Sequence, residues 1–369
     1  MKPNRARDIL RASEGRRVLL VGDLMMDEWV FGSVKRISPE APIPVVNMPL
    51  TPEARADKPG GAGNVAAILL GLGAAVRVVG VVGEDAYGER LLADLKSRGA
   101  DVSDVIVDPS RPTTHKMRII AGRQQLLRID TERADPMSPA VARELRDRLR
   151  ANLAQADAVL AADYAKGVLS ETSLPSDLIA QARESGLPFC ADPKPANIQL
   201  FRGASLVSPN EAEALEASGA VNSARGAAGP SEAGPSNAGP PEAGPLEEGA
   251  EVPAGLSMSP AVVRAGRHLR ALLASEAVFI TRGEHGIAVF CEDGAITEVP
   301  AQTGLGVVGD GTGCGDAVAA VAALALAAGA GYVEAAKLAN AAGGVVSRFV
   351  GVHSPEPSEI VDWLEARPS

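Results

Sequence analysis

The chain has few of the residues that mark disulfide-bonded, metal-binding or membrane proteins. Its 369 residues contain 3 cysteines and 4 histidines, all scattered, which favours a reducing compartment over a disulfide framework or a zinc site. No apolar run reaches the roughly 18 residues of a transmembrane helix. The N-terminal residues also lack the apolar stretch of a signal peptide. We therefore predict a cytoplasmic protein that does not bind membranes.

Aromatic residues and positive charge are scarce as well. Aromatic side chains make up 3% of the residues while 46% are hydrophobic, so the core is expected to be mostly Ala, Val and Leu. The net charge of −10 argues against a general nucleic-acid-binding protein. The length allows one large domain or two small ones.

Two common nucleotide-binding motifs are missing. A Gly-x-Gly-x-x-Gly fingerprint does not follow the first predicted strand, and no Gly-x4-Gly-Lys-Ser/Thr loop is present. The sequence therefore supports neither a hydride-transfer enzyme of the dinucleotide-binding type nor a P-loop kinase.

Short apolar runs alternate with helical patterns along most of the chain. This alternation predicts an α/β fold with a parallel sheet and right-handed crossovers. Polar side chains follow the strands, at the sheet edge where open α/β proteins bind ligands. The predicted strands are 17–23, 76–82, 105–107, 158–162, 188–191, 205–207 and 277–281, and the polar residues are Asp23, Asp27, Asp163, Lys166, Asp192, Lys194, Asn210 and Glu213.

Two segments depart from this alternation. A Pro-rich strand and a hairpin, at about 32–48 and 113–130, have no covering helices and predict a small β flap. Residues 219–256 carry an imperfect five-residue Ala-Gly-Pro repeat, whose composition cannot offset the entropy of ordering. We predict a single domain, 1–369, with a disordered insert at 219–256.

Two glycine clusters each precede a small-residue helix. Residues 309–316 read Gly-Asp-Gly-Thr-Gly-Cys-Gly-Asp, which predicts an anion seat at a helix start with Asp316 placed to accept a proton. The alternative is a glycine-rich turn with an N-capping Asp. Residues 60–64 form the second cluster, for which close helix–sheet packing is the alternative.

The order of these motifs resembles the ribokinase-like (PfkB) carbohydrate kinases. Residues 59–66 resemble the first signature of that family, 310–316 the second, and 208–213 its Asn-x-x-Glu element. The resemblance covers the chain apart from the insert; Gly311 and Cys314 depart from the usual second signature. It implies a three-layer α/β/α fold with a mostly parallel central sheet and a β lid, and an ATP-dependent sugar kinase.

The resemblance also implies roles for individual residues. Asp316 is the expected catalytic base, and the amides of Gly313, Cys314 and Gly315 form the expected anion hole. Mg²⁺ is expected to be water-bridged near Asn210 and Glu213, without a direct tight metal site; a monovalent cation is left open. The expected ATP and Mg²⁺ residues are Asn210, Glu213, Thr281, Gly283, Asp310, Thr312 and Asn340, and the sugar-binding residues are Asp23, Asp27, Gly60, Gly61 and Asn64.

Other stretches resemble the family members that phosphorylate D-glycero-β-D-manno-heptose 7-phosphate. This implies phosphorylation at O1 to the 1,7-bisphosphate, a step toward ADP-heptose. The His-x-Gly-His motif of the adenylyltransferase to which many such kinases are fused is absent, so we expect the kinase part alone. Another PfkB sugar kinase, of the ribokinase or fructokinase type, or a non-catalytic sugar-phosphate-binding protein are the alternatives. The supporting stretches are 21–32, 35–45, 123–130, 163–169 and 192–194.

A phosphorylated sugar needs cationic partners, and the flap segments supply them. The candidates for its phosphate are Lys35, Arg36, Lys116, Arg118, Arg123 and Arg128, although a solvated β surface would carry the same residues. Flap strands with free edges also favour pairing with a second copy of the chain, which predicts a homodimer.

Overall fold

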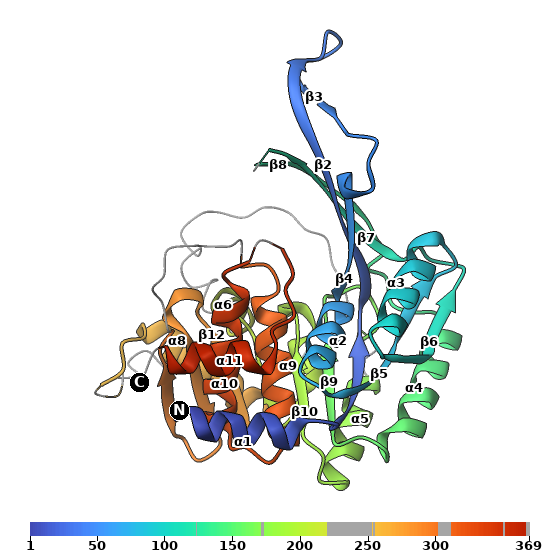
Figure 1. The fold of residues 1–369 in the computed structure, drawn as a ribbon. Coiled ribbons are helices and arrows are strands. Elements are labelled where there is room, and N and C mark those ends of the chain that lie inside the picture. Colours follow the sequence, from blue (N-terminus) through green and yellow to red (C-terminus); the bar gives the residue numbers. More distant parts are fainter. Residues whose placement is uncertain are drawn as a thin grey trace, which may run out of the picture.

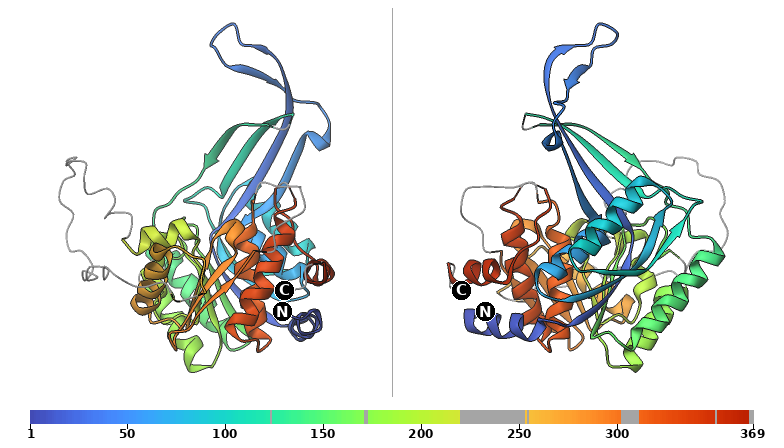
Figure 2. Two further views of the ribbon diagram at one scale, coloured as in Figure 1. Left: turned by 90° about the vertical axis from the view of Figure 1, so that its left-hand side faces the viewer. Right: turned by 45° about the vertical axis from the view of Figure 1, so that its right-hand side comes forward.

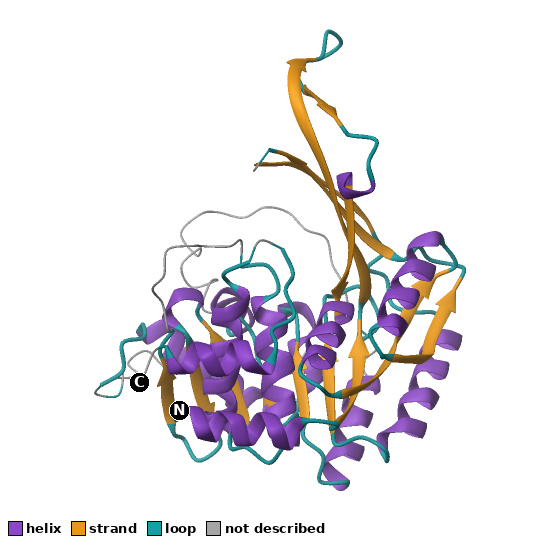
Figure 3. Cartoon of the chain, viewed as in Figure 1, coloured by secondary structure: helices purple, strands orange, loops and turns teal. Residues whose placement is uncertain are grey.

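The computed structural model describes residues 1–122, 124–170, 173–219, 253, 255–301, 311–349 and 351–366. It contains a helix-covered sheet and a second sheet that projects from it (Figures 1 and 3). Arg123, Asp310 and most of the predicted insert lie outside the described residues.

The central sheet has nine strands in the order β14-β13-β12-β11-β10-β9-β1-β5-β6. The strands from β12 to β6 pair in parallel, and β13 and β14 are antiparallel at one edge. The bounds are β1 Arg17–Gly22, β5 Ala75–Gly83, β6 Asp101–Asp108, β9 Ala158–Ala162, β10 Phe189–Asp192, β11 Leu206–Val207, β12 Ala277–Thr281, β13 Ile287–Cys291 and β14 Ile296–Val299.

Successive side chains of the central strands point to opposite faces, and each face has its own core. Val18 and Leu20 of β1 belong to one buried cluster, while Leu19 and Val21 belong to the other. Figure 2 shows helices on both sides of the sheet. On the first face lie α1 Pro3–Ser13, α2 Ala62–Gly71, α3 Ala86–Ser97, α9 Cys314–Ala327, α10 Tyr332–Val346 and α11 Pro357–Glu365, and on the second α4 Pro139–Leu153, α5 Ser173–Glu184, α6 Glu211–Ala217 and α8 Pro260–Leu273.

This arrangement confirms the predicted three-layer α/β fold. The helix and strand positions also follow the predicted alternation closely, because each buried strand is a short apolar run and each helix has an apolar face. No helix among the described residues is long and apolar enough to cross a membrane.

The second sheet has five strands: β2 Leu24–Ile37, β3 Pro44–Asn47, β4 Arg55–Gly61, β7 Thr114–Ala121 and β8 Gln124–Thr131. It is not purely antiparallel, because β2 pairs in parallel with β7. The outer part of β2 pairs with β3 and stands away from the helix-covered sheet (Figure 1).

The inner half of β2 and the whole of β4 were not predicted. The sequence placed Asp27 at the end of the first strand; the structure instead ends β1 at Gly22 and puts Asp27 inside β2. The structure pairs β2 with β4 in a register that places Asp27 opposite Lys58. The sequence does not predict these strands, because β2 contains two acidic residues and β4 contains Pro59 and two glycines. Tertiary pairing outweighs the weak local preference here.

Candidate active site

Two helix starts from opposite ends of the chain converge at one point. Asn64 lies in the first turn of α2 and Asp316 in the first turn of α9. The Asn64 Nδ2 donates to Asp316 Oδ2 at 2.5 Å. Gly313 caps α9 with φ of +82°, and a Cβ there would lie 3.1 Å from Asn64 Nδ2. The structure therefore brings the two glycine clusters together at one point.

A loop after β9 supplies a second partner for Asp316. The Tyr164 hydroxyl donates to Asp316 Oδ1 at 2.5 Å. The loop is held by Asp23, whose carboxylate accepts the backbone N–H groups of Tyr164, Lys166 and Val168 at 2.8, 3.0 and 3.1 Å. Burial raises the pKa of Asp23 to about 6. These bonds favour a positioning role for Asp23 over the sugar contact that we predicted for it.

Several carboxyl groups share the carboxyl edge of the sheet. Burial raises the pKa of Asp316 above its ordinary value, while the hydrogen bonds from Tyr164 and Asn64 act in the opposite direction. At the end of β10, burial and the nearby Asp316 raise the pKa of Asp192 to about 8. Asp192 therefore keeps its proton at neutral pH, which limits the negative charge beside Asp316.

The predicted nucleotide-side residues lie at the ends of β11 and β12. Asn210 is the N-cap of α6 and forms a capping box with Glu213. Glu213 Oε1 accepts the Lys194 ammonium at 2.6 Å and Oε2 accepts the Asn210 N–H at 2.9 Å. Thr281 forms a parallel bridge with Asn210, and Gly283 begins the turn after β12. The structure thus brings these four residues together, with Asn210 and Glu213 engaged in a helix cap.

The oxygen atoms of Asn210 and Glu213 suit a Mg²⁺ ion that they contact through water rather than directly. Each Glu213 oxygen already accepts one hydrogen bond within the protein. Within the described ranges, no group of three or more His, Cys, Asp and Glu side chains is arranged to hold a metal ion. Mg²⁺ keeps much of its hydration in many sites, so this donor set suits an indirect contact.

The start of α9 has the open, glycine-rich shape of an anion seat. Gly311 has φ of +69°, and a Cβ added at Gly311 or Gly315 would meet nothing within 4 Å. Thr312 lies in the turn that leads into the helix. The Cys314 N–H donates to the Gly311 carbonyl oxygen at 3.2 Å, so in this conformation that amide is engaged within the loop. Backbone groups and the helix dipole at this point suit a phosphate.

Asn340 and the sugar-side residues occupy separate positions around this seat. Asn340 on α10 donates to the Pro300 carbonyl oxygen at 2.9 Å, which fits a satisfied helix Asn. Gly61 caps α2 with φ of +54°, where a Cβ would lie 2.6 Å from the Asp23 carbonyl oxygen. Gly60 packs against the Asp27 side chain, and a Cβ at Gly60 would lie 2.8 Å from the Asp27 Cγ.

Asp27 is buried and paired with a cation. Arg118 Nη1 donates to Asp27 Oδ1 at 2.6 Å, and the Arg118 guanidinium lies 5.0 Å from the centre of the Trp29 ring. The sequence assigned Asp27 to the sugar and Arg118 to the phosphate; the structure shows them as an ion pair at the base of the second sheet.

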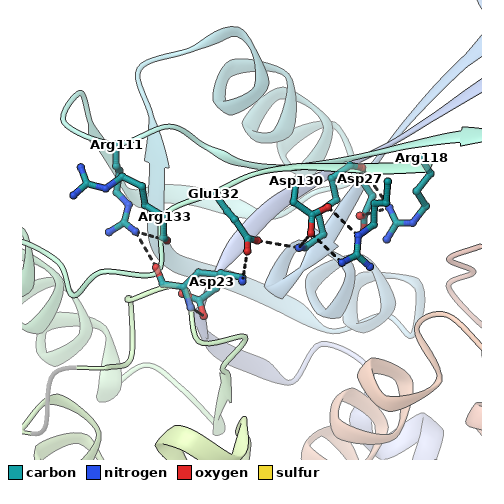
Figure 4. Close-up of polar contacts among 10 residues, drawn as sticks. Asp23, Asp27, Arg111, Arg118, Asp130, Glu132 and Arg133 are labelled. Carbon is teal, nitrogen blue, oxygen red and sulfur yellow. Dashed lines mark hydrogen bonds and ion pairs between the residues drawn. The ribbon is translucent and has the colours of Figure 1, made fainter. Parts of the chain in front are cut away.

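The other phosphate candidates divide into two groups. Lys116 contacts Asp130 and Glu132 at 3.1 and 2.9 Å, and Arg128 contacts Asp130 at 2.9 Å. Lys166 continues this row to the loop held by Asp23, at 2.7 Å from Glu132. Figure 4 shows the acidic members of the row, Glu132 and Asp130. Lys35 and Arg36 lie on the exposed outer part of β2, beyond the strands that carry Lys116 and Arg128. Within one chain, the structure gathers Lys116, Arg118 and Arg128 and leaves the other two apart.

Sequence reasoning gave Tyr164, Asp192 and Lys194 no role in the site. Asp192 and Lys194 were noted as polar residues after a strand, but Tyr164 was only part of a quoted stretch. Its place directly after β9, between two loop residues flagged by their charge, was the available signal. The Tyr164 ring lies 5.6 Å from the Lys194 Nζ, so it contacts both the Asp316 side and the Glu213 side of the site.

Comparison with known proteins identifies the family of the chain. Residues 29–235 and 247–359 match the model of the pfkB family of carbohydrate kinases. Proteins described as bifunctional protein HldE from Geobacter metallireducens and Bradyrhizobium diazoefficiens are 37% and 38% identical over 93% and 94% of this chain. The chain spans 62% of the length of these relatives.

Solved structures share the fold at low sequence identity. The ribokinase of Arabidopsis thaliana, complexed with ribose and ATP, has a TM-score of 0.64 at 18% identity, covering 95% of this chain and 99% of that one. Phosphofructokinase-2 of Escherichia coli, in complex with potassium, has a TM-score of 0.67 at 16% identity, with coverages of 95% and 99%. Because the family model matches most of the sequence, the chain belongs to the pfkB family and is a carbohydrate kinase.

Proposed function

We propose that this kinase transfers the γ-phosphoryl group of ATP to O1 of D-glycero-β-D-manno-heptose 7-phosphate. The observation that carries the reaction is Asp316, held by Asn64 and Tyr164 at the glycine-rich start of α9. The choice of sugar rests on the resemblance of five sequence stretches to heptose 7-phosphate kinases and on the similarity to the HldE proteins.

In the proposed reaction, Asp316 accepts the proton of the O1 hydroxyl as that oxygen bonds to the γ-phosphorus. The bond between the γ-phosphorus and the β-phosphate oxygen breaks, and ADP leaves. Backbone N–H groups at Gly313 and Gly315 face the charge that develops on the transferred group. Asn210 and Glu213 would hold Mg²⁺ through water, and the ion would supply positive charge that offsets the phosphate charge.

On the sugar side, the proposed ligands are Asp27 and Asn64, with Gly60 and Gly61 allowing the backbone to approach closely. The 7-phosphate would bind to Lys116, Arg118 and Arg128. Each cation would then contact a phosphate oxygen in place of its present carboxylate partner, which is Asp130, Glu132 or Asp27. Such an exchange keeps each cation paired, so it does not require an unpaired charge in the free enzyme.

The base is tested by Asp316→Asn. This variant keeps the shape of the side chain but cannot accept the proton, so turnover should fall about 10²- to 10⁴-fold while ATP binding is retained. ADP release and ATP binding by calorimetry measure the two effects. Asp94→Asn, which changes a half-buried carboxylate on α3 that is paired with Arg98, is the matched control. Near-normal turnover of Asp316→Asn would overturn the assignment.

The substrate is tested by ADP release over a panel of heptose 7-phosphate, ribose, fructose and fructose phosphates. The proposal expects the highest kcat/KM with the heptose phosphate. Preference for ribose or fructose would instead identify a different sugar kinase of the family. Binding of a sugar phosphate without ADP release would indicate a non-catalytic protein.

We also propose a homodimer formed through the second sheet. β3 and β8 are the ends of the strand order in that sheet, and it exposes Phe31, Leu127 and Ile129 to 40%, 55% and 47%. A second copy would cover both the free strand edges and these apolar side chains. Light scattering at micromolar concentration should give the mass of two chains, and a monomer would contradict the proposal.

A further inference from the structure

Tyr164 is tied to the site by three separate contacts. Its hydroxyl donates to Asp316 Oδ1, its backbone N–H donates to Asp23 Oδ2, and the Lys194 ammonium lies over its ring. The side chain is half-buried and fixed at both ends. A side chain held in this way can set the orientation of the group that it contacts.

The loop that carries Tyr164 is itself rigidly built. Asp163 accepts the N–H groups of Ala165 and Lys194 at 2.9 and 3.1 Å, and Ala165 adopts a positive φ of 55°. Asp23 accepts three more backbone N–H groups from the same loop. Two buried carboxylates therefore hold the short turn that aims the Tyr164 hydroxyl at Asp316.

We infer that Tyr164 is a positioning residue for the proposed base: its hydroxyl orients the Asp316 carboxylate and stabilises the ionised form that accepts the sugar proton. The inference rests on the proposed role of Asp316. Asn64 holds the other carboxylate oxygen, so the two donors together fix the plane of the carboxylate between α2 and the β9 loop.

The electrostatics of the site support this division of roles. Burial and the neighbouring Asp316 raise the pKa of Tyr164 well above its ordinary value, so the phenol stays protonated and acts as a donor. Burial raises the pKa of Asp316, and the Tyr164 hydrogen bond opposes that effect. Removing the hydroxyl should therefore raise the pKa of Asp316 further, because a bond to the charged form is lost.

The test is the pH dependence of kcat/KM for Tyr164→Phe, measured with the best sugar of the panel. This variant keeps the ring beside Lys194 and removes only the hydroxyl. The acid limb of the profile should move to higher pH by about one to two pH units, the effect of losing one hydrogen bond to a charged group. KM for ATP should stay close to the unsubstituted value.

Tyr332→Phe is the matched control, because it removes a hydroxyl that donates to Glu276 at 2.8 Å. Glu276 directly precedes β12, so this bond lies at the amino ends of the strands, away from Asp316. Its acid limb should not move. If Tyr164→Phe fails to fold, 3-fluorotyrosine at position 164 replaces it, and the more acidic phenol should move the limb to lower pH. Thermal unfolding confirms that each protein is folded.

The outcomes separate this inference from the proposed function. If the acid limb is unchanged in the Tyr164 variants, the positioning role is overturned. This holds whether kcat falls by the same factor at every pH or does not fall at all. If Asp316→Asn is inactive in that case, the base assignment survives. If Asp316→Asn remains active, the base assignment fails, and the Tyr164 inference fails with it.

Discussion

Gly60 offers a way to move Asp27 without changing its chemistry. Gly60 lies on β4 opposite Met25, and its backbone does not adopt a positive φ, so alanine is tolerated by the main chain. A Cβ at this position would overlap the Asp27 carboxylate, with the Cγ 2.8 Å away, and would lie 3.0 Å from the Met25 Cγ. Because the Asp27 carboxylate is nearer to this Cβ than Met25 is, the carboxylate is the group that must shift.

The expected size of the effect follows from the two interactions at stake. Overpacking of this kind costs about 1–3 kcal/mol of folding stability. If Asp27 binds a sugar hydroxyl, misplacing it loses about 1.5–3 kcal/mol of charge-assisted hydrogen bonding. That loss corresponds to a fall in kcat/KM for the sugar of about 10- to 150-fold, with KM for ATP unchanged.

Steady-state kinetics with each substrate varied in turn, together with thermal unfolding, measure both effects of Gly60→Ala. Asp27→Asn serves as the comparison, since it removes the charge and leaves the packing intact. Gly331→Ala is the control: φ there is −74° and a Cβ would meet nothing within 4 Å. An unchanged kcat/KM for the sugar in both Gly60→Ala and Asp27→Asn would refute the placement of Asp27 in the sugar site.

Two further predictions concern Asp23 and the cations of the second sheet. Asp23→Asn turns an amide NH₂ toward backbone N–H donors, so the protein should lose about 1–3 kcal/mol of stability in denaturant unfolding; unchanged stability would show that the loop does not depend on Asp23. Lys116→Ala and Arg128→Ala should raise KM for the phosphorylated sugar with little change for ATP. An equal rise in KM for ATP would move both residues away from the sugar phosphate.

The sequence predicted the central sheet well because its strands and helices are encoded locally. β9, for example, is an apolar run buried throughout, and its predicted bounds match the structure. The glycine clusters also predicted the helix starts that meet at Asp316, since a small residue is required where α2 and α9 approach.

The rest depended on contacts between distant segments. The pairing of Asp27 with Arg118 spans 91 residues, and the pairing of Tyr164 with Asp316 spans 152, so no local pattern reports either one. Lys35 and Arg36 resemble Lys116 in charge and flap position, but the register of β2 with β3 places them on its outer part. Residue type predicted which groups could act, and only the fold showed which of them meet.

The charge on Asp316 depends on a balance in which Asp192 has a specific part. The N-terminus of α9 favours an anion by only about 0.3–1 kcal/mol, less than the 1.36 kcal/mol that corresponds to about one pKa unit. The donors Asn64 and Tyr164 contribute more, at about 1.5–3 kcal/mol for a bond to a charged group. Both work against burial, which raises the pKa of Asp316. At neutral pH these donors can outweigh the effect of burial on Asp316, because Asp192, with a pKa of about 8, is still protonated and adds no negative charge.

Above pH 8 this condition fails. Ionised Asp192 adds a negative charge beside Asp316 and opposes the approach of the ATP phosphates, so kcat/KM for ATP should fall on the alkaline side. Asp192→Asn keeps a neutral group at every pH and should remove that alkaline limb while leaving the rate near pH 7 almost unchanged. A pH profile of this variant that keeps the limb would show that Asp192 does not carry it, and that the proton on Asp192 is irrelevant to the charge of the proposed base.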